Sequence, residues 1–176
     1  LFMRLSMAKD IEIPIDSLII SKDFEIEDYD IDQKGRMSFS GYASTNALDL
    51  ENEIIEAYAW EKDLHHYKKN PIICYNHDPR YPYGRALKVS ITDLGLHFDE
   101  IVLDPVPFVK DNLWPLIKSG TLSKMRVGFS SLEAERDQNG VIHHTRTRLF
   151  ENSVVSIPAN YDASIDSTGK YFGQCL

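Results

Sequence analysis

Residues 85–103, RALKVSITDLGLHFDEIVL, decide the fold class of this chain. On both sides of Asp93-Leu94-Gly95 the residues alternate between apolar and polar, which is the period-two pattern of a half-buried strand. A short glycine-containing connection between two such runs is typical of a β-hairpin. The stretch therefore predicts two adjacent antiparallel strands near the middle of the chain.

Other segments extend this sheet. The same alternation, or a short apolar run, predicts further strands at residues 37–42, 72–75, 122–135 and 141–157. Residues 58–69 and 105–120 carry apolar residues at helical spacing instead, and Gly120 is placed to end the second helix. We expect a mainly β protein with two or more helices (α+β). A closed or nearly closed antiparallel β-barrel fits best, because closure removes exposed strand edges.

The composition is that of a globular protein. Of 176 residues, 43% are hydrophobic and 26% are charged, which excludes wholesale disorder. The net charge of −8 argues against a nucleic-acid partner, because nucleic-acid binding normally needs a basic face. No apolar run approaches the roughly 18 residues of a membrane span, so we expect no membrane partner. Cys74 and Cys175 are too few for a disulfide framework or a cysteine-rich zinc site.

Three regions differ in texture. Residues 1–34 are predicted to form an acidic N-terminal arm or edge segment, since DFEIEDYDID at residues 23–32 carries six acids and no base. Residues 35–165 carry the strand and helix patterns and form the expected domain. Residues 166–176 show no periodicity and are expected to be an unstructured or cleaved tail.

Six histidines raise the question of a metal site. The adjacent pairs His65-His66 and His143-His144 are poor clamps for one ion, because neighbouring side chains point apart on a strand and diverge by about 100° on a helix. The sequence has no His-Glu-x-x-His or Cys-x-x-Cys spacing. We expect no metal and no cofactor.

Two other residues are candidates for acid–base chemistry. His77 follows a short apolar run, and a histidine there can accept a proton near neutral pH. Glu151 lies beside an apolar run, where a carboxylate needs a partner. His77 is either a structural loop residue or a general base. Glu151 is either a strand-edge residue facing water or the carboxylate that orients a histidine.

A third stretch, LSKMRVGFSS at residues 122–131, places Gly128 inside a strand pattern, which indicates a bulge or a close backbone approach. With four other stretches in order, it resembles the prohead (capsid-maturation) protease family of tailed bacteriophages, distantly similar to the herpesvirus assemblin proteases. The other stretches are GYAST at residues 41–45, Asn76-His77-Asp78 with the downstream Gly84, Lys118-Ser119-Gly120, and LFENSVVSIPAN at residues 149–160. Each motif alone is weak, but their ordered succession from about residue 35 to 165 is specific.

The resemblance implies a barrel of the herpesvirus-protease type, a homodimer and serine endopeptidase activity. It assigns the catalytic histidine to His77 and the third member of the triad to Glu151. It implies that the substrates are capsid and scaffold proteins, and also the protease itself through autoproteolysis. The implied location is the host cytoplasm, inside the procapsid during its maturation.

The nucleophile position departs from the family pattern. A serine is expected immediately before the hydrophobic-Gly-aromatic triplet, and Arg126 stands there. Arginine stays charged and is no nucleophile. The fallback nucleophile is Ser130, which shares strand parity with Arg126 but lies about 13 Å along an extended strand; Ser123 lies about 10 Å away on the other face. Cys74 is better explained as a small buried apolar residue than as a nucleophile.

Two functions of different classes follow. The first is a prohead-type serine endopeptidase, and the alternative is a catalytically silent protease-fold protein that serves capsid assembly or scaffolding. Arg126 favours the alternative, and we expect its guanidinium to form an ion pair with Glu151. A generic β domain with no viral role would require the ordered motifs to be accidental, and is disfavoured.

Overall fold

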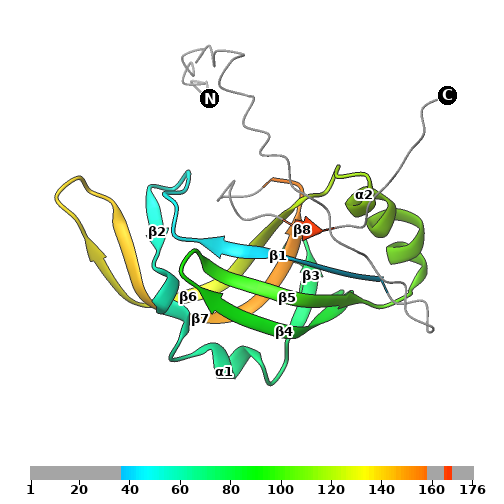
Figure 1. Cartoon of the computed structure of the whole chain (residues 1–176), viewed down its shortest axis with the longest axis horizontal. Helices are drawn as coiled ribbons and strands as arrows, with labels where there is room; N and C mark the ends of the chain where they lie inside the picture. The colour runs from blue at the N-terminus through cyan, green and yellow to red at the C-terminus, as the bar shows by residue number, and fades with distance from the viewer. Residues whose placement is uncertain (1–36, 158–164, 168–176) are drawn as a thin grey trace, which may run out of the picture.

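The structure is a computed structural model that describes residues 37–157 and 165–167. Within these residues, eight strands belong to one sheet and short helical segments connect them (Figure 1). The strands are β1 (Met37–Thr45), β2 (Glu53–Ile55), β3 (Ile72–Tyr75), β4 (Gly84–Thr92), β5 (Gly95–Leu103), β6 (Lys124–Arg136), β7 (Ile142–Val155) and β8 (Ile165–Ser167). The helical segments are η2 (Ala57–Trp60), α1 (Leu64–Tyr67), η3 (Val109–Leu113) and α2 (Trp114–Lys118).

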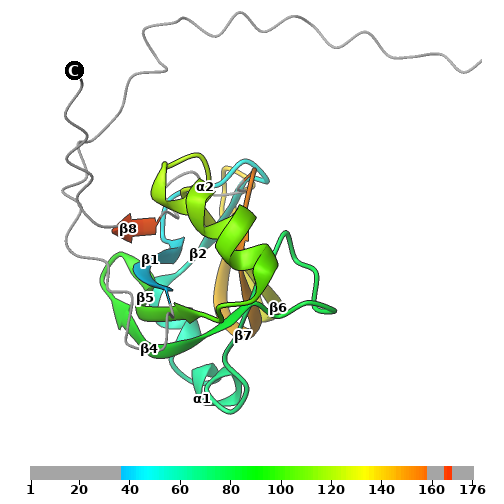
Figure 2. The same ribbon diagram turned by 90° about the vertical axis from the view of Figure 1, so that its right-hand side faces the viewer.

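The sheet curls into a nearly closed barrel. Its strands follow the order β2-β7-β3-β4-β5-β1-β8, and β6 pairs separately with β7. Most neighbours are antiparallel, but β2 and β3 both run parallel to β7. In the described part of the chain β1 and β6 touch without strand pairing, and this seam leaves the barrel unsealed, while α1 and α2 lie on opposite sides (Figure 1, Figure 2). The predicted mainly β, nearly closed and mostly antiparallel barrel is confirmed.

The hairpin at residues 85–103 confirms its sequence pattern. β4 and β5 pair antiparallel along their length. The apolar side chains of Leu96, Phe98 and Ile101 are completely buried, and burying each contributes roughly 1.5–3 kcal/mol. Gly95 has a φ of 144°, and a side chain there would collide with the Ser44 carbonyl of β1. Glycine therefore lets the hairpin turn approach β1 closely.

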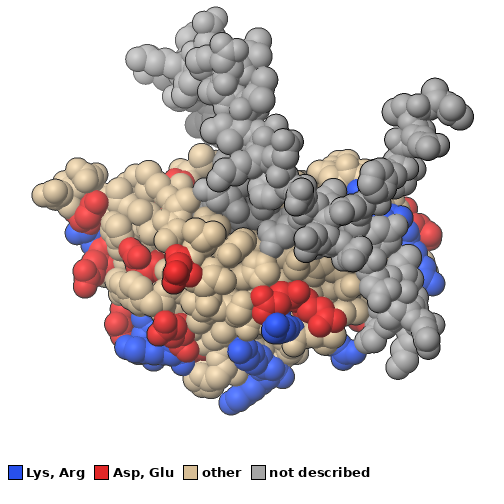
Figure 3. Space-filling view, in the orientation of Figure 1, with Lys and Arg blue, Asp and Glu red and all other residues tan. Residues whose placement is uncertain are grey.

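Among the described residues visible in Figure 3, charged side chains of both signs are interspersed, without a continuous basic surface. No helix within residues 37–157 is long and apolar enough to cross a membrane.

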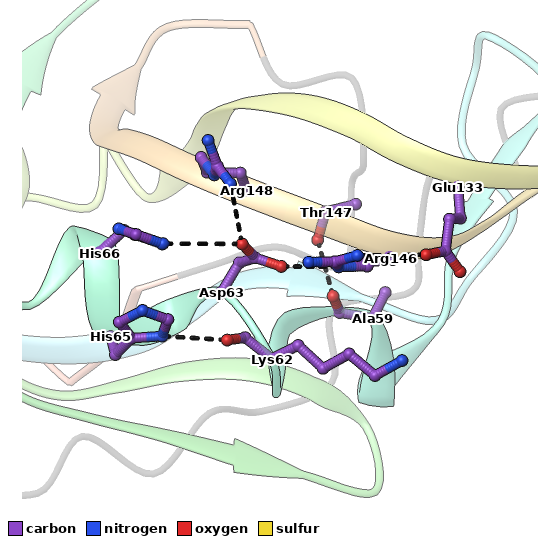
Figure 4. Close-up of polar contacts among 9 residues, drawn as sticks. All are labelled: Ala59, Lys62, Asp63, His65, His66, Glu133, Arg146, Thr147 and Arg148. Carbon is purple, nitrogen blue, oxygen red and sulfur yellow. Dashed lines mark hydrogen bonds and ion pairs between the residues drawn. The ribbon is translucent and has the colours of Figure 1, made fainter.

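The first helical region is shorter than predicted. Its spacing predicts one helix over residues 58–69, but the structure has η2 and α1 with a break before Leu64. Asp63, at the break, is buried and places its carboxylate 2.8 Å from Arg146 and 3.1 Å from Arg148 of β7 (Figure 4). The ion cluster ties the segment that leads into β3 to the strand that carries Glu151.

The second helical region follows the sequence more closely. The π-helical turn η3 runs into α2, and Pro115 occupies the first turn of α2, so the proline marks a fresh start of the helix. Gly120 has a φ of 77° and its N–H donates to the Ile117 carbonyl at 3.0 Å. The predicted glycine stop is confirmed.

The outer segments of the chain remain predictions. β8 lies at the expected junction between domain and tail, where it pairs with β1. The expected arm at residues 1–34 and the rest of the tail, residues 168–176, lie outside the described residues.

Candidate active site

A tight turn directly after β3 presents His77. Asn76 and His77 both have positive φ values, 50° and 59°, and this conformation costs a non-glycine residue roughly 1–2 kcal/mol. Two hydrogen bonds hold the turn against β7 and the residues after it. The Asn76 N–H donates to the Val154 carbonyl at 3.0 Å, and the Asn76 side-chain carbonyl accepts from the Ser156 N–H at 3.2 Å. The chain thereby folds back toward β7 at His77.

The imidazole of His77 meets the carboxylate of Glu151 on β7. Nδ1 of His77 lies 2.6 Å from Oε1 of Glu151, the length of a strong, charge-assisted hydrogen bond. The His77 side chain is 36% exposed and the Glu151 side chain only 13%, so the carboxylate lies behind the ring. Among the described residues no polar atom bonds Nε2 of His77. The sequence singled out both residues, and the fold brings them together.

Ser153 completes this arrangement from the same strand. Its hydroxyl donates to Oε2 of Glu151 at 2.6 Å and accepts from the His77 backbone N–H at 3.1 Å. The side chain is fully buried. Sequence reasoning missed Ser153, although its place two residues after Glu151 puts both side chains on one face of a strand.

β6 lies next to the strand that carries Glu151 and Ser153. It runs antiparallel beside β7, with Gly128 opposite Glu151 and Arg126 opposite Ser153. A side chain at Gly128 would collide with Oε1 of Glu151. The register also shifts between Gly128 and Phe129. The glycine therefore makes room for the Glu151 carboxylate, as the predicted close approach requires.

Arg126 does not form the expected ion pair with Glu151. Its Nη2 lies 3.2 Å from Oε1 of Glu51, which precedes β2. Both oxygens of Glu151 already have partners, and no ion pair joins Arg126 to Glu151 within residues 37–157. Because the Arg126 and Glu51 side chains are 38% and 58% exposed, their ion pair contributes at most about 1 kcal/mol.

The fallback nucleophile Ser130 lies elsewhere on the sheet. It pairs with Arg148 in the β6–β7 ladder, between Glu151 and the turn that connects β6 to β7. No hydrogen bond joins Ser130 to His77 or Glu151 in the described ranges. The structure therefore does not assemble Ser130 with the two acid–base candidates.

Cys74 lies close to the site but is chemically quiet. It is buried on β3, opposite Ser153 in the parallel pairing with β7. Burial, reinforced by the charges of Glu151 and Asp78, raises the pKa of Cys74 to about 11. The thiol stays protonated at neutral pH, and the thiol form is a poor nucleophile.

A cavity of about 70 Å³ lies in the seam beside Arg126, between the end of β1 and the first half of β6. Three carboxylates line it and offer oxygens within 4.8 Å of one another: Asp49, Glu51 and Glu53. Each carboxylate already has a partner. Asp49 accepts two backbone N–H groups, Glu51 pairs with Arg126, and Glu53 lies 3.0 Å from Nε2 of His144. Internal contacts explain the trio, so we assign it no metal.

Sequence comparison identifies relatives of this chain. Residues 22–173 match the family of caudovirus prohead serine proteases. The chain is 33% identical over 162 residues to the prohead protease of Escherichia phage T5, covering 90% of this chain and 72% of that protein. It is 28% identical over 135 residues to the capsid polyprotein of Pseudomonas phage PAJU2, covering 73% of this chain and 19% of the polyprotein. The chain belongs to the caudovirus prohead serine protease family.

Proposed function

We propose that this chain carries the acid–base machinery of a serine endopeptidase that processes capsid and scaffold proteins inside the maturing procapsid. The observation that carries the proposal is the 2.6 Å contact between Nδ1 of His77 and Oε1 of Glu151, with no hydrogen bond to Nε2 from any described residue. Membership of the prohead protease family supports substrates of the procapsid. The similarity to a phage capsid polyprotein supports the same partners.

Each residue of the pair has a defined role. Nε2 of His77 takes the proton of a hydroxyl as that hydroxyl attacks the peptide carbonyl, and the imidazolium then protonates the leaving amine. Glu151 accepts a hydrogen bond from Nδ1–H of His77, so it selects the tautomer with a bare Nε2 and stabilises the charged ring. A water molecule repeats the attack on the acyl-enzyme with His77 again as the base.

The hydroxyl of this mechanism belongs at position 126. Arg126 lies opposite Ser153 in the ladder, and side chains of opposite residues stand on one face with Cβ atoms about 5 Å apart. A serine at 126 would therefore lie next to the His77–Glu151 pair. With Arg126 in place, the site has its base but lacks this nucleophile.

A second function follows from the same residue. The ion pair between Arg126 and Glu51 favours a catalytically silent protease-fold protein that serves capsid assembly or scaffolding. In that case the barrel is a binding module whose partners are the proteins that an active relative would cleave.

One experiment separates these functions. The purified chain and its Arg126→Ser variant are incubated with a fluorogenic peptide library, and self-cleavage is followed by mass spectrometry. We expect cleavage in Arg126→Ser that disappears in Arg126→Ser/His77→Ala. Cleavage by the unaltered chain that His77→Ala abolishes would refute the silent function. Inactivity of both chains would refute the proposed role of the His77–Glu151 pair.

The homodimer implied by the family resemblance also stays a prediction. Light scattering coupled to gel filtration measures it directly, since a dimer has twice the 20.2 kDa mass of the chain.

A further inference from the structure

We propose that Ser153 is a positioning residue, which orients the His77 imidazole by holding the Glu151 carboxylate and the His77 backbone with one hydroxyl. This inference rests on the proposed function of His77 and Glu151. Ser153 would touch neither substrate nor the reacting atoms, and would act only through these two residues.

The hydrogen-bonding capacity of a hydroxyl carries the first step. A serine has one proton to donate, and the Ser153 proton goes to Oε2 of Glu151 at 2.6 Å. This bond fixes the rotation of the carboxylate and leaves Oε1 facing Nδ1 of His77. The acidic side chain is thereby held at both oxygens, one by the residue it orients and the other by Ser153.

The second step concerns the turn that presents the histidine. A lone pair of the Ser153 hydroxyl accepts the His77 backbone N–H at 3.1 Å. His77 has a φ of 59°, a conformation that persists only where the surroundings enforce it. Ser153 therefore ties down the backbone of His77 as well as the partner of its ring.

Burial makes these bonds persistent. β7 runs between β3 and β6 at this point, with Cys74 and Arg126 as the ladder partners of Ser153. The Ser153 side chain is completely buried, so water cannot easily replace its bonds. Removal of the hydroxyl would leave Oε2 of Glu151 and the His77 N–H without a partner among the described residues.

The same geometry excludes Ser153 as the missing nucleophile. Its proton points to Glu151, and its contact with His77 is to the backbone N–H rather than to a ring nitrogen. A buried hydroxyl on a strand between two others is also out of reach of a peptide substrate.

Nitrogen NMR of the full chain, with ¹⁵N-labelled histidine, tests the proposal without requiring activity. Ser153→Ala is compared with Thr147→Val, which also removes a fully buried β7 hydroxyl, one that donates to the Ala59 carbonyl at 3.2 Å (Figure 4). We expect similar losses of thermal stability in both variants. Only Ser153→Ala should shift His77 from the Nδ1–H tautomer toward a mixture, and Ser153→Thr, which keeps a hydroxyl, should restore it. Ser153→Cys, similar in volume but a weak donor, replaces Ser153→Ala if that variant does not fold.

An unchanged His77 tautomer in folded Ser153→Ala or Ser153→Cys would overturn the proposal. A change of the same size in Thr147→Val would also overturn it, because the effect would then be general loosening of β7.

In the Arg126→Ser chain we expect Ser153→Ala to lower kcat about 10- to 100-fold, with KM changed by less than about twofold. If Arg126→Ser is inactive but the tautomer still shifts, the role of Ser153 stands and the proposed protease function falls. If Arg126→Ser is active and Ser153→Ala changes neither kcat nor tautomer, the protease function stands and the role of Ser153 falls.

Discussion

Two carboxylates at β7 have opposite kinds of partner: Asp63 contacts the strand from outside, and Glu151 belongs to it. Asp63 is buried and lies 2.8 and 3.1 Å from Arg146 and Arg148, with His66 at 3.8 Å (Figure 4). Glu151 has a neutral hydroxyl and a histidine as partners, and Nε2 of that histidine has no hydrogen-bond partner in the part of the chain that the structure describes. Arginines never release their protons, so the two short contacts of Asp63, at 2.8 and 3.1 Å, have no acid–base capacity, whereas the imidazole that contacts Glu151 exchanges a proton near neutral pH. Asp63 therefore links two chain segments through permanent cations, whereas Glu151 contacts a residue that can take part in proton transfer.

The electrostatics of Asp63 follow from this pairing. Hydrogen bonding to Arg146 is the main cause that lowers the pKa of Asp63, against the opposing effect of burial, and Arg148 adds to it. The carboxylate is therefore held ionised wherever the protein is folded near neutral pH. Its role is to join the segment before β3 to β7, and thereby to keep the two chain segments of the candidate site in register.

The largest effect should come from neutralising the acid at the site. In the Arg126→Ser chain, Glu151→Gln keeps the shape of the side chain but presents an uncharged amide to Nδ1 of His77. We expect peptide cleavage to fall by about 10²–10⁴-fold, because the imidazolium loses its counter-charge and the tautomer is no longer selected. Initial-rate kinetics measure this. Activity within about threefold of the parent would contradict the assigned role.

Neutralising Asp63 should lower the thermal stability of the chain. Asp63→Asn leaves Arg146 and Arg148 facing a neutral amide, and we expect the midpoint of thermal unfolding to fall by roughly 5–10 °C. The matched control is Asp78→Asn, which breaks an exposed ion pair with Arg80 and should lower the midpoint by less than about 2 °C. Differential scanning calorimetry gives both values. Equal shifts would show that burial adds nothing to the Asp63 cluster.

The smallest effect is a dependence on acid. A carboxyl whose pKa is lower in the folded than in the unfolded chain stabilises fully above its ordinary pKa of about 3.9, and this contribution disappears as the pH falls through the lower folded value. The difference in unfolding free energy between the parent and Asp63→Asn should therefore be constant above about pH 5 and shrink below pH 4. Urea unfolding at a series of pH values measures it. A difference that grew toward low pH would contradict the direction of the shift.

Sequence patterns predicted the barrel and the acid–base pair for identifiable reasons. The hairpin at residues 85–103 was recognisable because a half-buried strand shows its period directly. His77 and Glu151 were recognisable because each is a polar residue beside an apolar run, where an isolated charge would be unfavourable. Their 2.6 Å contact bridges 74 positions of sequence, and the family motifs, rather than the pattern, indicated that they meet.

Other features depend on tertiary contacts that no local pattern encodes. Ser153 reads as a small residue within an apolar run, and only the fold shows that its hydroxyl reaches both His77 and Glu151. The predicted ion pair between Arg126 and Glu151 is wrong because Glu51, from a loop distant in sequence, pairs with Arg126 instead. The predicted helix over residues 58–69 is too long because Asp63 is held by two arginines of β7, a tertiary contact that helical spacing does not encode.

The missing side chain at Gly128 has a consequence for how this sequence can change. A methyl group there would occupy the space of the Glu151 carboxylate, and an aspartate at 151, one methylene shorter, would make room but withdraw the acid from His77. A substitution at either position would therefore disturb the contact between Glu151 and His77. The residue at position 128 and the residue at position 151 therefore constrain each other: the absence of a side chain on β6 leaves the space that the Glu151 side chain of β7 occupies.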